Sequence, residues 1–226
     1  MRSIGRGLLV AALVAGLCEL PAAAGTSEKP LGVVLVAEHA HQTGEKAMAG
    51  TTVYAGDAFD TEESGTIGLR VGTSQLFLLS SSAAAFGESA PIARVQLTRG
   101  TMVFSSPASG EFELETPAGM LRGAAGGAAS GRVALTGPQE MIISAYRGDL
   151  LLDNEGELHT IAAGKAYRVV IEDSEVTATA EQDPPAPVHR ARHRRKLAFY
   201  IVTTAAVAGI SAAIWNKLSE STYKPN

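Results

Sequence analysis

Thr66-Ile-Gly-Leu-Arg-Val71 and Phe112-Glu-Leu-Glu115 decide the fold, because apolar and polar side chains alternate in both stretches. In the first, Ile67, Leu69 and Val71 share one face. Successive side chains of a strand point to opposite faces, so a period of two predicts strands with one buried face. The two stretches therefore predict sheet rather than helix.

Similar short apolar segments recur on both sides of these stretches, between residues 25 and 176, and they are separated by Gly, Asp or Pro. Regularly spaced strands with such turns predict an all-β domain, either a sandwich or roll or a short solenoid. Ser80–Ala85 and Gly123–Ser130 are expected to be loops, or in part a short helical turn. The further predicted strands are Leu31–Ala37, Gln75–Leu79, Val95–Thr98, Met102–Phe104, Met141–Ala145, Leu150–Leu152 and Tyr167–Ile171.

Composition limits the kind of core and the kind of partner. Apolar residues make up 46% of the chain but aromatic ones only 5%, so the core must consist mainly of Val, Leu, Ile and Ala. Between Gly25 and Val188 there are 21 acidic residues and 10 basic ones. An acidic domain repels phosphate backbones, so nucleic acid is not an expected partner.

The first 24 residues are typical of a secretory signal peptide. Arg2 and Arg6 form the positive start, Leu8–Leu17 the apolar region, and Ala22–Ala24 the small residues before a cleavage site. The alternative is an uncleaved signal anchor. The signal predicts export, with the domain on the periplasmic side of a bacterial inner membrane.

Cys18, the only cysteine, lies inside this predicted signal. Leu17 precedes it where lipoprotein processing requires a small residue, so lipidation is not expected. Once the signal is removed, the chain holds no thiol. Disulfides, a catalytic cysteine and a cysteine-based zinc site are then excluded.

The C-terminal part reads as a membrane attachment. Residues 177–196 form a proline-rich and then basic linker, residues 197–215 carry no charge, and residues 216–226 are a polar tail. Nineteen uncharged residues suit a transmembrane helix across a core of about 30 Å. Small residues recur along the predicted helix, and helix–helix dimerisation through them is one hypothesis. They are Ala205, Gly209 and Ala213.

The basic run before the predicted helix conflicts with the predicted export. The positive-inside rule places such a run in the cytoplasm, whereas the signal places it outside. If the signal decides, the run rests on anionic headgroups of the outer leaflet; a helix inserted the other way, or not spanning, is the alternative. The run consists of Arg190, Arg192, Arg194, Arg195 and Lys196.

The turns between the strands follow an order. In two Gly-Asp turns, the Gly can adopt a positive φ and the Asp carboxylate can accept hydrogen bonds from backbone N–H groups. A Thr-Pro pair ends a strand, because Pro has no N–H to donate to the next strand. All of these are predicted to be scaffold residues rather than a functional site. The turn residues are Gly56, Asp57, Gly100, Thr116, Pro117, Gly148 and Gly164.

The order and spacing of the turn motifs along the chain resemble those of the FecR domain family over roughly Leu31–Val170. The resemblance rests on Gly56-Asp-Ala-Phe-Asp-Thr61, Leu97-Thr-Arg-Gly100-Thr-Met-Val-Phe104, Phe112-Glu-Leu-Glu-Thr-Pro117-Ala-Gly119, Tyr146-Arg-Gly148-Asp-Leu-Leu-Leu152 and Ile161-Ala-Ala-Gly164. It implies an extracytoplasmic all-β domain that acts by protein contact and has no catalytic centre.

Two departures from that family limit the resemblance. We expect no cytoplasmic helical segment before the domain and no second domain after Val170, so sigma-factor regulation is not transferred. The family motif Gly-Thr-x-Phe-x-Val is replaced in this chain by Gly123–Gly131, a segment rich in Gly and Ala. This replacement predicts irregular strand pairing there.

Two groups of side chains are candidate metal sites. His39 and His41 would share a strand face, but zinc needs further ligands that the sequence does not identify. Glu111, Glu113 and Glu115 would line another face, where a solvated surface is the simpler interpretation. We expect no metal and no cofactor.

No nucleophile elbow, phosphate-binding loop or zinc-protease motif is present in the sequence, which predicts a protein that is not an enzyme. The leading hypothesis is a membrane-anchored envelope module that binds or senses a partner protein, of unknown identity, or a surface polymer. The rival is an assembly protein that self-associates as a homo-oligomer. A hydrolase with a dispersed site comes third.

Overall fold

The computed structural model describes residues 29–89, 92–107, 112–172 and 196–202. These residues form sixteen strands and, within the described ranges, no helix, so the all-β prediction is confirmed. The strands are β1 (Gly32–Gln42), β2 (Glu45–Lys46), β3 (Thr52–Val53), β4 (Ala58–Val71), β5 (Ser74–Leu78), β6 (Ala83–Ser89), β7 (Ile92–Arg99), β8 (Thr101–Ser106), β9 (Phe112–Thr116), β10 (Gly119–Gly123), β11 (Ala129–Gly137), β12 (Glu140–Arg147), β13 (Leu150–Asn154), β14 (Glu157–Ile161), β15 (Ala166–Glu172) and β16 (Lys196–Ile201).

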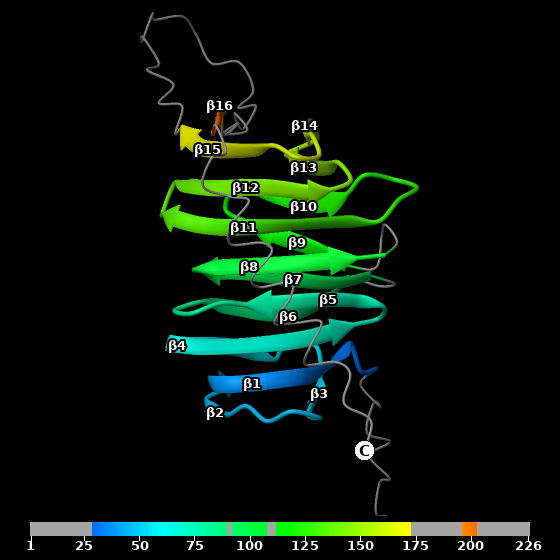
Figure 1. The fold of residues 1–226 in the computed structure, drawn as a ribbon, viewed down its shortest axis with the longest axis vertical. Coiled ribbons are helices and arrows are strands. Elements are labelled where there is room, and N and C mark those ends of the chain that lie inside the picture. Colours follow the sequence, from blue (N-terminus) through cyan, green and yellow to red (C-terminus); the bar gives the residue numbers. More distant parts are fainter. Residues whose placement is uncertain (1–28, 90–91, 108–111, 173–195, 203–226) are drawn as a thin grey trace, which may run out of the picture.

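All the strands belong to one sheet that curls on itself around β4. Residues 58–60 of β4 pair with β6, whereas residues 67–71 pair with β5. From β4 one wing continues through β6, β7, β9, β10 and β13 to β14, and we call it the back wing. The front wing continues through β5, β8, β11, β12 and β15 to β16, and Figure 1 shows the two as stacked layers. The arrangement is a rolled sheet rather than a sandwich of two separate sheets.

The hydrophobic core lies between the two wings. Phe104 of the front wing meets Phe112 of the back wing edge-to-face, with ring centroids 5.6 Å apart. Gly131 lies where any Cβ would approach the side chains of Phe104 and Leu150 to 3.0 Å. Most other core residues are aliphatic, as the composition predicts. The short distance between the two wings depends on small residues at positions such as Gly131, because interiors are close-packed.

The alternation that predicts the sheet is present in the burial of the strands. In β9, Phe112, Leu114 and Thr116 are buried, and the alternating Glu113 and Glu115 are partly exposed. In β4 the predicted face of Ile67, Leu69 and Val71 is fully buried. The prediction of strands from alternating residues was therefore correct where one face of the strand is apolar and the other is polar.

The predicted loops were wrong in part. Ala83–Ala85, the second half of the predicted loop Ser80–Ala85, are the first three residues of β6. In the second predicted loop, Gly123–Ser130, strand β11 begins at Ala129. Alanine alone gives no period, so these strands form because their neighbours supply the pairing. The irregular pairing expected at Gly123–Gly131 is present as a register shift between Ser130 and Gly131.

The C-terminal prediction needs a correction. Lys196–Ile201 pairs antiparallel with β15 as β16, so the first residues of the predicted transmembrane helix form a strand, and Lys196 of the predicted linker belongs to it. In the described part of the chain, no helix has the length and apolar character to cross a bilayer. The predicted signal peptide, the linker up to residue 195, and residues 203–226 lie outside the described residues.

Candidate interaction surface

The first Gly-Asp turn is held by the carboxylate of Asp57. Its Oδ2 accepts hydrogen bonds from the backbone N–H of Tyr54 at 2.8 Å and from Nε2 of Gln42 at 3.0 Å. Gly56 has a φ of 91° and its N–H donates to the carbonyl of Phe86 at 2.7 Å. The turn therefore ties β1, β4 and β6 together, which is the scaffold role that the sequence predicts.

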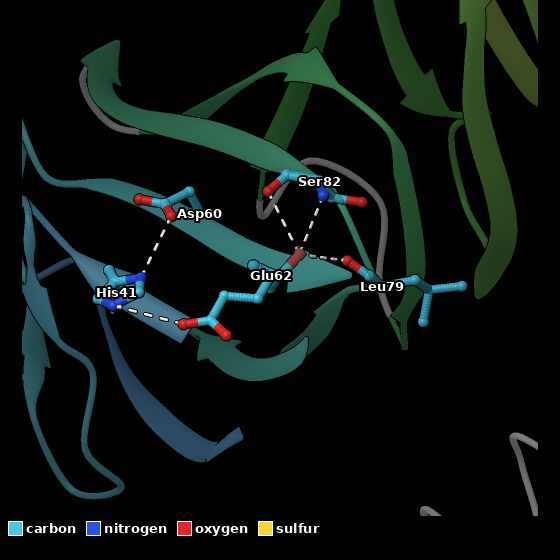
Figure 2. A network of polar contacts seen from close by, with 6 residues as sticks. His41, Asp60, Glu62, Leu79 and Ser82 are labelled. Carbon is cyan, nitrogen blue, oxygen red and sulfur yellow. Dashed lines mark hydrogen bonds and ion pairs between the residues drawn. The ribbon is translucent and has the colours of Figure 1, made fainter. Parts of the chain in front are cut away.

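Thr61, four residues after Asp57, closes the neighbouring turn before β6. Its hydroxyl donates to the carbonyl of Leu79 at 2.5 Å and accepts the backbone N–H of Ser82 at 2.9 Å (Figure 2). Ser82 is itself fully buried, and its hydroxyl accepts the backbone N–H of Thr101 at 2.8 Å. The pair links both wings beside β4. Ser82 carries no recognisable signal in the sequence, because it is the last of three consecutive serines and nothing local distinguishes it from the other two.

The remaining predicted turn residues also serve the backbone. The hydroxyl of Thr116 donates to the carbonyl of Gly119 at 2.8 Å across the turn that holds Pro117. Gly148 has a φ of 69°, and Oδ1 of Asp149 accepts the N–H of Ala163 at 2.8 Å.

Gly164, with a φ of 74°, donates to the carbonyl of Ala145 at 2.8 Å. Gly100 has a φ of 80° and lies against Ser82. These contacts join backbone groups of separate turns.

The two histidines do not share a strand face. His39 has a φ of 44° and lies at the register shift between Glu38 and Ala40, where β1 bulges against β4. His41 lies with Nδ1 3.3 Å from Asp60 and Nε2 3.8 Å from Glu62 (Figure 2). Among the described residues, no three His, Cys, Asp or Glu side chains are grouped to hold a metal ion.

The glutamates of β9 are paired rather than free to bind a cation. Glu113 lies 4.0 Å from Arg122 of β10, and Glu115 accepts a hydrogen bond from Gln96 of β7 at 3.4 Å. Glu111, the third, lies outside the described residues. The face is a network of cross-strand polar pairs, each contributing about 1 kcal/mol or less.

A shallow depression of about 290 Å³ lies beside the turn at Gly100. Arg99, Pro117, Thr136 and Pro138 are among its lining residues, which include no carboxylate and no histidine. An acid–base pair requires two titratable groups within reach of a substrate. The depression offers a guanidinium, hydroxyl groups and backbone groups as binding contacts.

The outer face of the front wing carries a continuous row of cross-strand neighbours, which we call the outer row. The register pairs its members strand by strand from β1 to β15. Burial raises the pKa of Tyr146, which lies near this face, and the nearby Arg132 guanidinium opposes the rise. The outer row consists of Val36, Gly68, Phe77, Val103, Arg132, Ser144 and Ala166.

The far end of the roll, away from β1, exposes apolar side chains. Figure 1 shows β14 and β16 at this end of the roll. The last strands of the two wings meet there, since the ring centroids of His159 in β14 and Phe199 in β16 are 4.6 Å apart.

Leu158 is 54% exposed, Tyr200 55% and Ile201 65%. Leu158 shares the outer face of the back wing with Asp153, and Tyr200 shares the outer face of the front wing with Arg168. We call Leu158, Tyr200 and Ile201, which lie around the end strands rather than on one face, the end patch. End strands present backbone donors and acceptors to a partner, and exposed apolar groups add contact area.

The other predicted functional residues are not placed. Of the basic run only Lys196 is described, and it is exposed in β16. The remaining arginines of that run and the small residues Ala205, Gly209 and Ala213 lie outside the described residues. The end patch had no sequence signal, because its members come from strands 40 residues apart in the chain.

Neither a protein-family model nor any curated protein matches this chain. The chain is similar to two crystal structures, at 1.65 and 2.50 Å resolution, of a candidate anti-sigma factor from Parabacteroides distasonis. The identities are 13% and 14%, and the TM-scores are 0.42 and 0.43. Each match covers 50% of this chain and 54% of the other, so the chain spans about half the length of that protein. FecR membership stays a prediction.

Proposed function

We propose that this chain is a non-catalytic, FecR-like interaction domain of the bacterial cell envelope that binds a partner protein at the end patch. The observation that carries the proposal is the meeting of β14 and β16, which brings Leu158, Tyr200 and Ile201 to one end of the roll. A partner adding a strand there gains main-chain hydrogen bonds and apolar contact together.

The polar groups of the domain support a binding role over catalysis. Asp57, Thr61, Ser82 and Asp149 direct their side chains at backbone groups of turns, where they hold the roll closed. A catalytic site requires such groups to converge on a cavity instead. The hydroxyls and carboxylates most prominent in the sequence are thus used by the scaffold.

Site-specific photo-crosslinking in cells tests the partner site. A photoreactive residue at Leu158 or Tyr200 is expected to give adducts with one distinct envelope protein. The matched control places the same residue at Gln96, which is exposed on β7 in the back wing. Equal adducts from all three positions would reject the end patch. Adducts with only a second copy of the chain would support the assembly role in its place.

The extracytoplasmic location requires its own test. Residues 184–187, Pro-Pro-Ala-Pro, lie in the chain between β15 and β16 and belong to the predicted extended linker. In intact spheroplasts an added protease is expected to cleave this segment, whereas a cytoplasmic marker protein stays whole. Protection of the segment, with cleavage only after lysis, would place the domain in the cytoplasm and contradict the proposal.

A further inference from the structure

Apart from Arg132 and Ser144, the outer row carries no polar side chain, although it faces away from the core. Phe77 is only 7% exposed and Ala166 1%, and neither belongs to the core cluster between the wings. The ring of Phe77 lies over Gly68, where an added Cβ would come within 2.7 Å of the ring and 2.8 Å of the Val36 side chain. The outer row is therefore packed like an interior surface.

The neighbouring positions extend this apolar surface. Ala134 of β11 is 8% exposed and also lies outside the core cluster, and Ile142 of β12 is its cross-strand partner. Even Nε of Arg132, the one charged member of the outer row, is buried. A solvated face of an antiparallel sheet is normally polar. Such a face needs a cover, and the cover must itself be apolar.

The chain leaves the sheet at the end of this row. The backbone N–H of Val202, directly after β16, donates to the carbonyl of Ala166 at 2.9 Å. Ala166 is the last member of the outer row, so residue 203 begins where the row ends. Residues 203–215, Thr-Thr-Ala-Ala-Val-Ala-Gly-Ile-Ser-Ala-Ala-Ile-Trp, carry no charge.

The length of this segment suits the row and does not suit a membrane. From β15 to β1 the row crosses six strand spacings, about 29 Å at 4.8 Å each. Thirteen extended residues reach about 43 Å, which is sufficient. With β16 formed, residues 202–215 would make a helix of only about 21 Å, short of a bilayer core of about 30 Å.

We propose that residues 203–215 lie across the outer row of the front wing as an intramolecular strap. The strap covers Phe77, Val103 and Ala134 and shields the apolar outer face from solvent. If β16 detached from β15, the whole run 197–215 would regain the length of a membrane span. This inference does not depend on a partner at the end patch.

A disulfide scan of the full chain tests the strap. Cys18 is replaced by Ala in every variant, and Val103→Cys is combined in turn with Ala206→Cys, Ala208→Cys and Ile210→Cys. We expect that mild oxidation converts more than half of at least one pair into an intramolecular disulfide, detected by intact mass. With Gln96→Cys in the back wing in place of Val103→Cys, the same three tail cysteines should give less than a tenth as much.

Trp215 provides a second readout in the unmodified chain, because it is the only tryptophan. Val103→Lys should release the strap and raise the acrylamide quenching constant of Trp215 at least threefold, with the far-UV circular dichroism still that of a sheet. Gln96→Lys should leave it unchanged. No preferred disulfide, disulfides only between two chains, or a quenching constant insensitive to Val103→Lys would each overturn the proposal.

Discussion

Thr61 of β4 forms two hydrogen bonds with the backbone of Ser82, in the buried turn before β6, one through its side chain and one through its own backbone. The N–H of Ser82 donates to the hydroxyl of Thr61 at 2.9 Å, and the N–H of Thr61 donates to the carbonyl of Ser82 at 2.9 Å. Both residues are almost fully buried. A buried turn of this kind has no water to replace a lost bond, so it should be sensitive to the loss of one oxygen atom.

We expect Thr61→Val to lower the free energy of unfolding by about 1–3 kcal/mol, because it leaves the Ser82 N–H and the Leu79 carbonyl without the hydroxyl. Urea unfolding followed by circular dichroism measures the change. Thr98→Val is the control, since Thr98 is exposed and its hydroxyl bonds a single carbonyl at 3.1 Å. Equal losses in the two variants would contradict the role of Thr61.

Gly100→Ala should destabilise the roll more than Gly156→Ala. Both glycines have positive φ, 80° and 92°, so both variants carry a backbone cost of about 1–2 kcal/mol. At Gly100 the new Cβ would also lie 2.6 Å from Cα of Ser82, whereas at Gly156 it meets nothing within 4 Å. Overpacking adds about 1–3 kcal/mol. Thermal unfolding of the two variants compares them directly. Equal midpoints would show that the contact between the new Cβ at residue 100 and Ser82 adds no cost.

The two Gly-Asp turns should differ in importance. Asp57 accepts hydrogen bonds from Tyr54, Gln42 and Thr43, whereas Asp149 accepts one from Ala163. We expect Asp57→Ala to cost about 2 kcal/mol and Asp149→Ala about 1 kcal/mol. Chemical denaturation measures both losses.

Glu63→Ala, in an exposed position of β4, serves as the control and should change little. A larger loss at Asp149 than at Asp57 would contradict this ranking of the two turns.

The ion pair of Glu140 and Arg168 predicts a pH dependence. Nη2 of Arg168 lies 2.6 Å from Oε2 of Glu140, and this hydrogen bond lowers the pKa of Glu140 below its ordinary value of 4.5. A lowered pKa in the folded state adds stability above pH 4.5, and that stability is lost as the pH falls through the folded pKa. The effect is small because both side chains are solvated.

Glu140→Gln should therefore be less stable than wild type at pH 7 and equally stable near pH 2. Urea unfolding of both proteins across this range measures the difference. Glu63→Gln, on the exposed part of β4, should show no such convergence. A difference between Glu140→Gln and wild type that stayed constant with pH would show that the pair contributes by contact rather than by charge.

Sequence prediction succeeded where polarity alternates and failed where it does not. Phe112-Glu-Leu-Glu115 alternates, and the structure buries Phe112 and Leu114 as predicted. Ala83–Ala85 has no alternation and was missed as a strand, because an alanine row takes its conformation from β4 and β7 on either side. The predicted helix at 197–215 was wrong at Leu197–Ile201 for a related reason, since a continuous apolar run fits either a helix or a buried strand.

The all-β class of the domain and the turns at Gly56, Gly100, Gly148 and Gly164 could be predicted from the sequence, because alternation and glycine conformation are local properties. Only the tertiary structure decided that the sheet rolls around β4, that Thr61 meets Ser82, and that β14 meets β16 at an apolar end. Those contacts join residues 20 to 40 positions apart. No local pattern encodes which strands pair over such distances, since pairing depends on the packing of all the others at once.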